Sequence, residues 1–591
     1  MKSNKIINLI LLVLLSTSCI NMLQEEPISS LSSEIIFTNM RDANTAITGM
    51  YAGFVPYFAT LTPVYGWGEC GTDIIQGNTA DQAQKFQKYA YTSSDADVLK
   101  VWSSLYTIIN RANNIIYNVP KIEGTDTEKN ALIGEAMCVR AYCYMDLVQY
   151  FGGVPLRVQP TQSIEDAISK PRATERQTWT QIISDLEFAE QYLPAKAPSA
   201  GRVTEWTAKG LLAKAYLTRG GYPVGNYAEE ADSLWFQKAA TKAYEVISQS
   251  GISLNPTTPG SATAFKQYGK MFLESGKNSA ESLWEIQFKD PDYGSAFGWR
   301  SISGGSPNGM DITLNGTYYY QWGGVFLSPD FALSYNDEDV RFQWSVGPYK
   351  TTVAGGITTR TAISVSSWAL AKYRWERVPS NVWNSAVNYI ALRMADIYLI
   401  YAEASNEATG DPNNSTLGTS AYGAINMVRS RAQITAMDDA YLMKNSPYTT
   451  IDLMHNISFQ SFDKTNPNYD KRHIYYTGTL KERFRAAVLM ERAWEFVGER
   501  HRWFDLKRTG KLVEFCKNTH TFASGGVLTA AAVADPVDKS NFTSLIKTTM
   551  LSPISTWSAT AINSHQLYMP LPETEININP AIGKENQNLG Y

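Results

Sequence analysis

The feature that most constrains the fold is a series of long segments with helical periodicity that stop at proline or glycine. In residues 128–151, apolar side chains recur every three or four positions, which places them on one face of a helix. These side chains are Ile133, Met137, Ala141, Tyr144 and Val148. Residues 97–120 have the same period and end at Pro120. The two segments together predict a helical hairpin.

Further segments repeat this pattern along the chain. A second pair covers 174–194 and 204–221, ending at Pro and at Gly-Gly, and a single helix is predicted at 233–251. Later helical segments cover 388–410, 421–432 and 480–506. Repeated helix pairs of this kind predict a mainly α fold, a tetratricopeptide-like scaffold of helical hairpins with an irregular repeat length.

Residues 256–385 differ from the helical segments. They are rich in Gly, Ser, Thr, Asn, Tyr and Trp, and "SLWEIQF" at 282–288 alternates like a strand. We therefore expect an N-terminal helical region at 19–255, a loop-rich insertion with short strands at 256–385, and a C-terminal region at 386–591 that completes the scaffold. Loops on a rigid frame often carry binding residues.

The N-terminus has the order of an export signal. Lys2 and Lys5 precede a short apolar run, and small residues then lead to Cys19. This order predicts a lipoprotein signal peptide at 1–18 and lipidation of Cys19, although an ordinary secretory signal with an incidental Cys is the alternative. Two acyl chains would anchor the protein stably. No later segment is long and apolar enough to cross a bilayer.

Composition excludes several classes of function. The net charge is −4 and no basic run occurs, which argues against a nucleic-acid partner. The five His residues have no zinc-type spacing, so we expect no metal and no cofactor. Cys138 and Cys143 are predicted to be buried free thiols, and a disulfide between Cys70 and Cys516 is left open.

The segment "ERAWEFVGERHRWFDLKRTG" at 491–510 concentrates charge and aromatic rings. Glu491, Glu495 and Glu499 recur every four residues, so a continuous helix would place them on one face, where they would repel one another. Arg492 lies three residues before Glu495, and Arg502 lies three residues after Glu499. These spacings allow the two Arg side chains to compensate the carboxylates.

Gly498 suggests close packing or the start of a bend, because Gly is unfavourable inside a helix. A structural network is the favoured interpretation of this segment. The alternative is a glycosidase, which needs two carboxyls facing a sugar. Neighbouring Arg residues would hold the pKa of these carboxyls down, which does not suit a general acid. We expect His501 to be packed or hydrogen-bonded.

Five segments in order resemble the SusD/RagB family of outer-membrane lipoproteins. They are "MLQEEPISSLSSEIIFTNMRDANTAITGMYAGF", "AMCVRAYCYMDLVQYFGGVPL", "LRMADIYLIYAEASNE", "VLMERAWEFVGERHRWFDLKRTG" and "YMPLPETEININPAIGKENQNLGY". Arg500 stands where the family often has Gly. The resemblance implies the SusD-like helical fold, a lipid anchor, and a position at the outer surface of the cell over a SusC-like TonB-dependent transporter. It also implies capture of glycans, or of peptides in some members, without catalysis.

Two aromatic-rich loops are the predicted ligand site, because sugars bind through ring stacking and planar polar groups. The resemblance places binding residues in comparable segments. The first loop, 65–82, contributes Trp67, Asp73, Gln76 and Asn78. The second, 292–324, contributes Tyr293, Trp299, Arg300, Tyr320 and Trp322. We therefore predict a glycan-binding lipoprotein. A peptide-binding protein of the same fold is the first alternative, and a glycoside hydrolase is less favoured.

Overall fold

The computed structural model describes most of the chain, in sixteen ranges. They are 37–58, 62–77, 83–221, 233–289, 312–314, 317–319, 325–336, 338–347, 349–354, 357–362, 368–373, 386–444, 451–452, 457–458, 476–516 and 564–591. These residues form mostly helices with a few short strands, which confirms the mainly α prediction. Within these ranges no helix has the length and apolar character that crossing a bilayer requires. The predicted signal peptide and Cys19 lie outside them.

Both predicted helical hairpins are confirmed. The first consists of α6 (Ala96–Asn118) and α7 (Asp126–Phe151), and the second of α9 (Glu175–Tyr192) and α10 (Glu205–Gly220). Capping boxes begin α7, α9 and α10, where a Thr side chain accepts a hydrogen bond from the backbone three residues on. Short polar motifs in the sequence therefore determine where these helices start.

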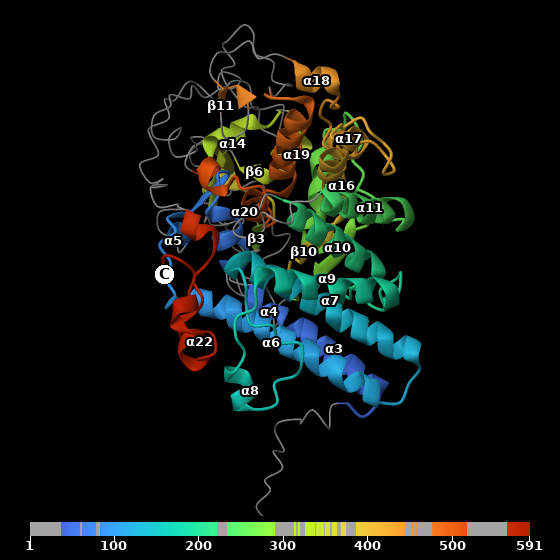
Figure 1. Ribbon diagram of the computed structural model, residues 1–591. Coiled ribbons are helices and arrows are strands. Elements are labelled where there is room, and N and C mark those ends of the chain that lie inside the picture. The colour runs from blue at the N-terminus through green and yellow to red at the C-terminus, as the bar shows by residue number, and fades with distance from the viewer. Residues whose placement is uncertain are drawn as a thin grey trace, which may run out of the picture.

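Successive helices pack side by side into a layered stack. α7 lies between α6 and α9, and α10 lies between α9 and α11 (Ser233–Gln249). The stack continues through α16 (Met394–Thr409) to α17 (Ala421–Arg431) and α19 (Leu480–Phe496). Figure 1 shows this series rising from the blue N-terminal helices to the orange α19. The stack is the tetratricopeptide-like scaffold that the sequence predicts.

Further α-helices pack around this stack, and the first of them, α3, lies against α6 and α7. They are α3 (Met40–Ala52), α4 (Phe54–Phe58), α5 (Ala83–Gln87), α8 (Ile164–Ile168), α12 (Ala264–Gly269), α14 (Pro329–Ser334), α15 (Val340–Ser345), α18 (Asp439–Met443), α20 (Arg502–Arg508) and α22 (Glu573–Ile578). A π-helix, η1 (Thr62–Cys70), follows α4. Helices with the wider π turn are rare and occur often at functional sites.

A four-stranded sheet lies beside the helices, in the order β1-β5-β9-β6. Its strands are β1 (Ile75–Gly77), β5 (Val325–Leu327), β9 (Ala369–Leu370) and β6 (Val346–Gly347). All pairs in it are antiparallel, and β1 is an edge strand.

The remaining strands form two-stranded pairs. The predicted strand at 282–288 is confirmed as β2 (Ser282–Ile286), which pairs with β10 (Tyr389–Arg393). Hairpins join β3 (Ile312–Leu314) to β4 (Thr317–Tyr319) and β7 (Tyr349–Ala354) to β8 (Ile357–Ala362). A further short pair joins β11 (Ile451–Asp452) to β12 (Ile457–Ser458).

The C-terminal residues 564–591 return to the N-terminal helices. The Met569 amide donates to the Tyr150 carbonyl at 2.7 Å, and the Glu573 amide donates to the Ser93 carbonyl at 2.9 Å. In Figure 1 the red segment with α22 lies beside the blue helices. Residues 564–591 therefore pack against the region around α6 and α7.

The charged segment 491–508 does not form one continuous helix. α19 ends at Phe496, and Glu499 lies beyond it, so the prediction that three glutamates share one helix face is wrong for Glu499. Gly498 has φ +81°, and a Cβ there would lie 2.7 Å from a Leu370 methyl carbon. Gly498 thus has both predicted roles, close packing and a bend.

The four cysteines within the described ranges are buried and form no disulfide. This confirms the prediction that Cys138 and Cys143 are buried thiols. It also settles the pair left open by the sequence, because Cys70 and Cys516 are not bonded to each other.

Candidate functional site

The three glutamates of the charged segment are buried and paired with cations from other elements. Glu491 accepts from Arg341 at 2.6 Å and from Arg429 at 2.7 Å. Glu495 accepts from Arg393 at 2.6 Å and also pairs with Arg431. The side chains of all three glutamates are at most 1% exposed.

These pairs belong to a network that we call the core ion network. It contains five cations and five anions, so its formal charge is zero. Its members are Arg341, Lys372, Arg393, Arg429, Arg431, Glu281, Asp339, Glu491, Glu495 and Glu499. Buried charges are tolerated when each has partners of opposite sign. The network fixes how α19 docks against α15, α17 and β10.

The expected compensation within the segment is wrong. Arg492 donates to Asp505 at 2.7 Å and to Asp396 at 2.8 Å, not to a glutamate of the segment. Arg502 pairs with Asp73, more than four hundred residues earlier in the chain. Sequence spacing suggested Glu495 and Glu499 as partners. Instead, Arg492 reaches from α19 to carboxylates on α16 and α20, and Arg502 reaches from α20 to Asp73 before β1.

The electrostatics of Glu495 and Asp505 suit permanent anions. Burial alone would raise the pKa of Glu495, but Arg431, Arg393 and Arg341 outweigh it and hold that pKa well below its usual range. The pKa of Asp505 falls to about 2 because Arg492 and Arg508 overcome its burial. A carboxylate with a pKa this low cannot donate a proton at neutral pH. The segment therefore has a structural role, as the sequence favours.

His501 is packed and hydrogen-bonded, as predicted. Its ring stacks on Phe496 with centroids 4.3 Å apart, and its Nδ1 lies 3.2 Å from Nη2 of Arg492. Burial and the nearby Lys214 lower its pKa well below the usual value, so the ring is neutral at pH 7.

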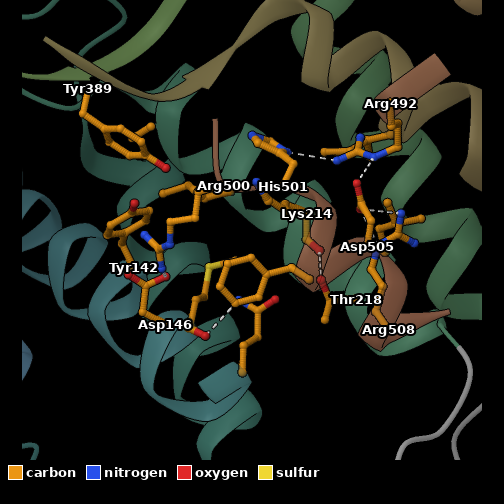
Figure 2. Close-up of a pocket in the computed structure, with 17 residues that line it drawn as sticks. Tyr142, Asp146, Lys214, Thr218, Tyr389, Arg492, Arg500, His501, Asp505 and Arg508 are labelled. Atoms are coloured by element: carbon orange, nitrogen blue, oxygen red, sulfur yellow. Dashed lines mark hydrogen bonds and ion pairs between the residues drawn. The ribbon is translucent and has the colours of Figure 1, made fainter. Parts of the chain in front are cut away.

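A small internal cavity lies beside this segment, between α7, α10, β10 and α20 (Figure 2). Charged groups including Asp146, Lys214 and Arg500 line it, and its volume is about 40 Å³. That volume holds one or a few water molecules. Sites for small organic ligands usually measure about 300–1,000 Å³, so this cavity is too small for a sugar ring.

A larger pocket of about 380 Å³ lies between α19 and the segment 502–515. Leu489, Met490 and Phe515 form its apolar part, and Arg485 and Lys511 line it with charge. Its size falls in the ligand range. Phe515, however, is only 5% exposed, so this pocket offers no open aromatic face for stacking.

Two of the predicted ligand residues have structural contacts instead. Trp67 is 1% exposed and packs among aromatic rings, with the Tyr150 ring 5.1 Å away. Asp73 is fully buried and forms two bonds with Arg502, at 2.8 and 2.5 Å. This burial contradicts the expectation that Trp67 and Asp73 contact a ligand. No pattern in the sequence indicates that η1 turns Trp67 inward.

The structure describes one of the other seven predicted residues, and only its backbone. The backbone of Gln76 lies in β1. The other six fall outside the described residues: Asn78, Tyr293, Trp299, Arg300, Tyr320 and Trp322.

The structure nevertheless pairs a strand of the first predicted loop with the strand that directly follows the second. β1 pairs with β5, with Gln76 opposite Phe326 and Gly77 opposite Val325. The first loop continues directly from β1, and the second ends where β5 begins. We call this pair of strands the β1–β5 edge. Segments that are about 250 positions apart in the sequence thus meet at one sheet edge.

In the part of the chain that the structure describes, no group of three or more His, Cys, Asp or Glu side chains is arranged to hold a metal ion. The buried carboxylates near the two cavities are engaged by Arg or Lys, as with Glu403 and Arg508 at 2.5 Å.

Comparison with known proteins agrees with this architecture. The family model described as "SusD family" matches residues 280–591, more than half of the chain, and one described as "Starch-binding associating with outer membrane" matches residues 23–217. A SusD-like protein, P2, from Formosa agariphila is 26% identical over 532 residues, covering 86% of this chain and 91% of that protein.

Solved structures share the fold. A SusD homolog from Bacteroides thetaiotaomicron superimposes with a TM-score of 0.72 at 21% identity, covering 96% of this chain and 100% of that one. A structure described as a laminarin-binding SusD-like protein has a TM-score of 0.63 at 20% identity, covering 94% and 100%. From the family match and the shared fold together, we conclude that this chain belongs to the SusD family.

Proposed function

We propose that this protein is a cell-surface lipoprotein that binds oligosaccharides or polysaccharides and delivers them to a SusC-like TonB-dependent transporter. The observation that carries the proposal is the pairing of β1 with β5, because the polar segment that follows β1 and the aromatic-rich segment that precedes β5 adjoin these two strands in the sequence. Rings and planar polar groups close together make a surface that suits sugar rings. Gln76, Asn78, Tyr293, Trp299, Arg300, Tyr320 and Trp322 are the proposed ligand residues.

Relatives support a glycan as the ligand. One matching family model is described as starch-binding, and one structure of the same fold is described as laminarin-binding. These two descriptions name different glucans, so the fold alone does not select the glycan. The identity of the sugar must depend on the side chains at the β1–β5 edge and in the loops beside it.

The proposed location is the outer membrane, with the body of the protein facing the exterior. Cys19 after a short apolar run is the proposed lipid anchor. The family model for residues 23–217 is described as associating with the outer membrane, which agrees with an anchor of this kind. The transporter as partner follows from family membership.

The electrostatics of the charged segment 491–508 favour binding without catalysis. A glycosidase needs one carboxylic acid that stays protonated and a second carboxylate beside the same sugar. In the described residues, carboxylates of the charged segment are saturated by Arg, and Arg neighbours lower the pKa of Glu495. An acid held in this way has no proton to donate.

The test is calorimetry with soluble starch, laminarin and the oligosaccharides of each, extended to other plant and algal glycans. Trp322→Ala and Trp299→Ala should weaken binding about tenfold or more, since stacking of a flat ligand ring on an aromatic side chain contributes about 1–3 kcal/mol. Tyr117→Ala is the control, because Tyr117 is 45% exposed on α6 and lies in neither predicted loop.

The same samples separate the alternatives. Binding of oligopeptides with no binding of any glycan would replace the glycan by a peptide on the same fold. Release of shorter sugars during incubation would indicate a hydrolase and overturn the binding-only role. Binding unchanged in both Trp variants would move the site away from these loops.

A further inference from the structure

The charged segment 491–508 contacts the four-stranded sheet near three of its strands. Arg341 lies in α15, just before β6, and pairs with Glu491 and Glu495. Lys372 lies two residues after β9, donates to the Glu495 carbonyl at 2.6 Å and pairs with Glu499. These contacts place β6 and β9 relative to α19.

The third contact is at β1, the edge strand. Asp73 lies two residues before Ile75, the first residue of β1, and pairs with Arg502 at the start of α20. Nε of Arg502 donates to Oδ1 of Asp73 at 2.8 Å, and Nη2 donates to Oδ2 at 2.5 Å. The two parallel bonds fix the orientation of the carboxylate as well as its distance.

Ser328 extends this contact to β5. Its hydroxyl donates to the Asp73 carbonyl at 2.8 Å, and its amide donates to the Ile74 carbonyl at 2.8 Å. Ser328 follows Leu327, the last residue of β5. Arg502 therefore holds the point at which both strands of the β1–β5 edge come together.

The Arg502–Asp73 ion pair is better explained by the position that it gives to β1 than by a gain in the free energy of unfolding. The side chains of Arg502 and Asp73 are 2% and 0% exposed, so both lose their hydration. The attraction in a buried pair often only offsets that loss, and an apolar pair of similar size can be as stable. The pair does, however, allow only one arrangement of β1 against α20.

We propose that Arg502 is a positioning residue for ligand binding, acting through Asp73 and Ser328 on the β1–β5 edge. This inference rests on the proposed function, since it assumes that the ligand contacts the loops beside that edge. Arg502 itself is buried against Asp73 and need not touch the ligand.

A matched ion pair elsewhere makes the proposal testable. Arg140 and Asp185 form the same two-bonded arrangement, at 2.8 and 2.7 Å, and are equally buried. They join α7 to α9, outside the sheet. Asp73→Asn and Asp185→Asn therefore remove the same charge from similar surroundings, and only the first acts on the β1–β5 edge.

The experiment measures melting temperature and affinity for soluble starch, laminarin and their oligosaccharides in the full-length protein, below the melting temperature of each variant. We expect both variants to melt earlier. We expect Asp73→Asn to weaken glycan binding about tenfold and Asp185→Asn to leave it within about twofold. Equal affinities in the two variants would overturn the proposal.

Hydrogen exchange provides a second measurement that does not depend on a ligand. In Asp73→Asn, the amides of 75–77 and 325–327 should exchange faster than in Asp185→Asn, because β1 loses its attachment to α20. If the wild type binds no glycan at all, the proposed function fails, whereas this exchange result still tests the attachment.

Ser328→Ala covers the case in which Asp73→Asn does not fold. Ser328→Ala removes the hydrogen bond from the Ser328 hydroxyl to the backbone carbonyl of Asp73 and leaves the Arg502–Asp73 ion pair in place. We expect Ser328→Ala to weaken glycan binding several-fold with a small loss of stability. Full affinity in Ser328→Ala, together with unchanged exchange at 325–327, would overturn the proposal.

Discussion

Arg393 and Glu499 face each other through two parallel hydrogen bonds, from Nε to Oε2 and from Nη2 to Oε1, each 2.8 Å long. Arg393 comes at the end of β10, and Glu499 comes just after α19. A third nitrogen, Nη1 of Arg393, reaches both Glu281 and Glu495. One side chain thus ties together a strand, the end of a helix and the glutamates of the core ion network.

Glu495 is the anion on which this network depends most. Its carboxylate contacts Arg341, Arg393 and Arg431. Glu495→Gln keeps the shape but removes the charge, so three buried guanidinium groups share too few anions. We expect a loss of about 3–5 kcal/mol in the free energy of unfolding, measured by urea denaturation.

The control for Glu495→Gln is Glu514→Gln. Glu514 pairs with Lys511 at 2.7 Å, but both side chains are more than 40% exposed. An exposed pair contributes about 0–1 kcal/mol. A loss below about 1 kcal/mol in Glu495→Gln, similar to the control, would show that the core ion network does not stabilise the fold.

Glu69 predicts an unusual dependence of stability on pH. Burial raises its pKa to about 8, although the Arg500 amide donates to its Oε1 at 2.7 Å. A carboxyl with a raised pKa binds its proton more tightly in the folded chain than in the unfolded chain. Its stabilising effect is therefore full below pH 4.5 and is lost as the pH rises from about 4.5 to about 8.

Glu69→Gln cannot ionise and should not lose this contribution. We expect the variant and the wild type to be similarly stable at pH 4.5. At pH 9 the variant should be more stable by at most about 5 kcal/mol, because each tenfold change in proton affinity corresponds to roughly 1.4 kcal/mol. Urea denaturation at several pH values measures the difference. If the free energies of unfolding of the two proteins changed with pH in parallel, Glu69 would be ionised in the folded chain, with no raised pKa.

The sequence was sufficient for the helical scaffold. Apolar periodicity located α6, α7, α9 and α10, and a Pro or a Gly followed each of them closely. The Gly at position 498 also indicated close packing or a bend there. These features are local, so each can be read from a few neighbouring residues.

The ion pairs could not be predicted in this way, because their partners are distant in the sequence. Arg502 and Asp73 are 429 positions apart, and Arg341 and Glu491 are 150 apart. Spacing within 491–508 suggested Glu495 and Glu499 as partners, but the carboxylates that pair with Arg492 and Arg502 lie on α16, on α20 and before β1. The inward position of Trp67 likewise depends on η1, whose π geometry no simple pattern indicates.

Arg500 shows the opposite case, in which a family pattern predicts the backbone. It stands where Gly is common in the family, and its φ is +68°, a region that favours Gly. Arg500→Gly should relieve about 1–2 kcal/mol of strain but leave Asp146 buried without its ion pair. We expect a net loss of about 2–3 kcal/mol, measured by urea denaturation.

A second substitution separates the two effects at Arg500. In Asp146→Asn with Arg500→Gly, the uncompensated charge is gone and the relaxed backbone remains. Figure 2 shows Asp146 and Arg500 together at the internal cavity. We expect the double variant to be more stable than Arg500→Gly alone. If the effects of the two substitutions on the free energy of unfolding simply add, the Arg500–Asp146 ion pair contributes nothing to folding.

Arg172 attaches the C-terminal segment to the end of α7. Arg172 donates to the Asn586 carbonyl at 2.6 Å, to Oδ1 of Asn588 at 2.5 Å and to the carbonyl of Phe151 at 2.7 Å.

Arg172→Ala removes these bonds together, so residues 584–591 should open locally while the helical stack stays folded. A loss of about 2 kcal/mol in local stability would make their amides exchange roughly 30-fold faster. Lys170→Ala is the control, because Lys170 holds Asn579 only through its backbone carbonyl. Exchange that rises equally across the whole chain would indicate global rather than local unfolding and contradict the prediction.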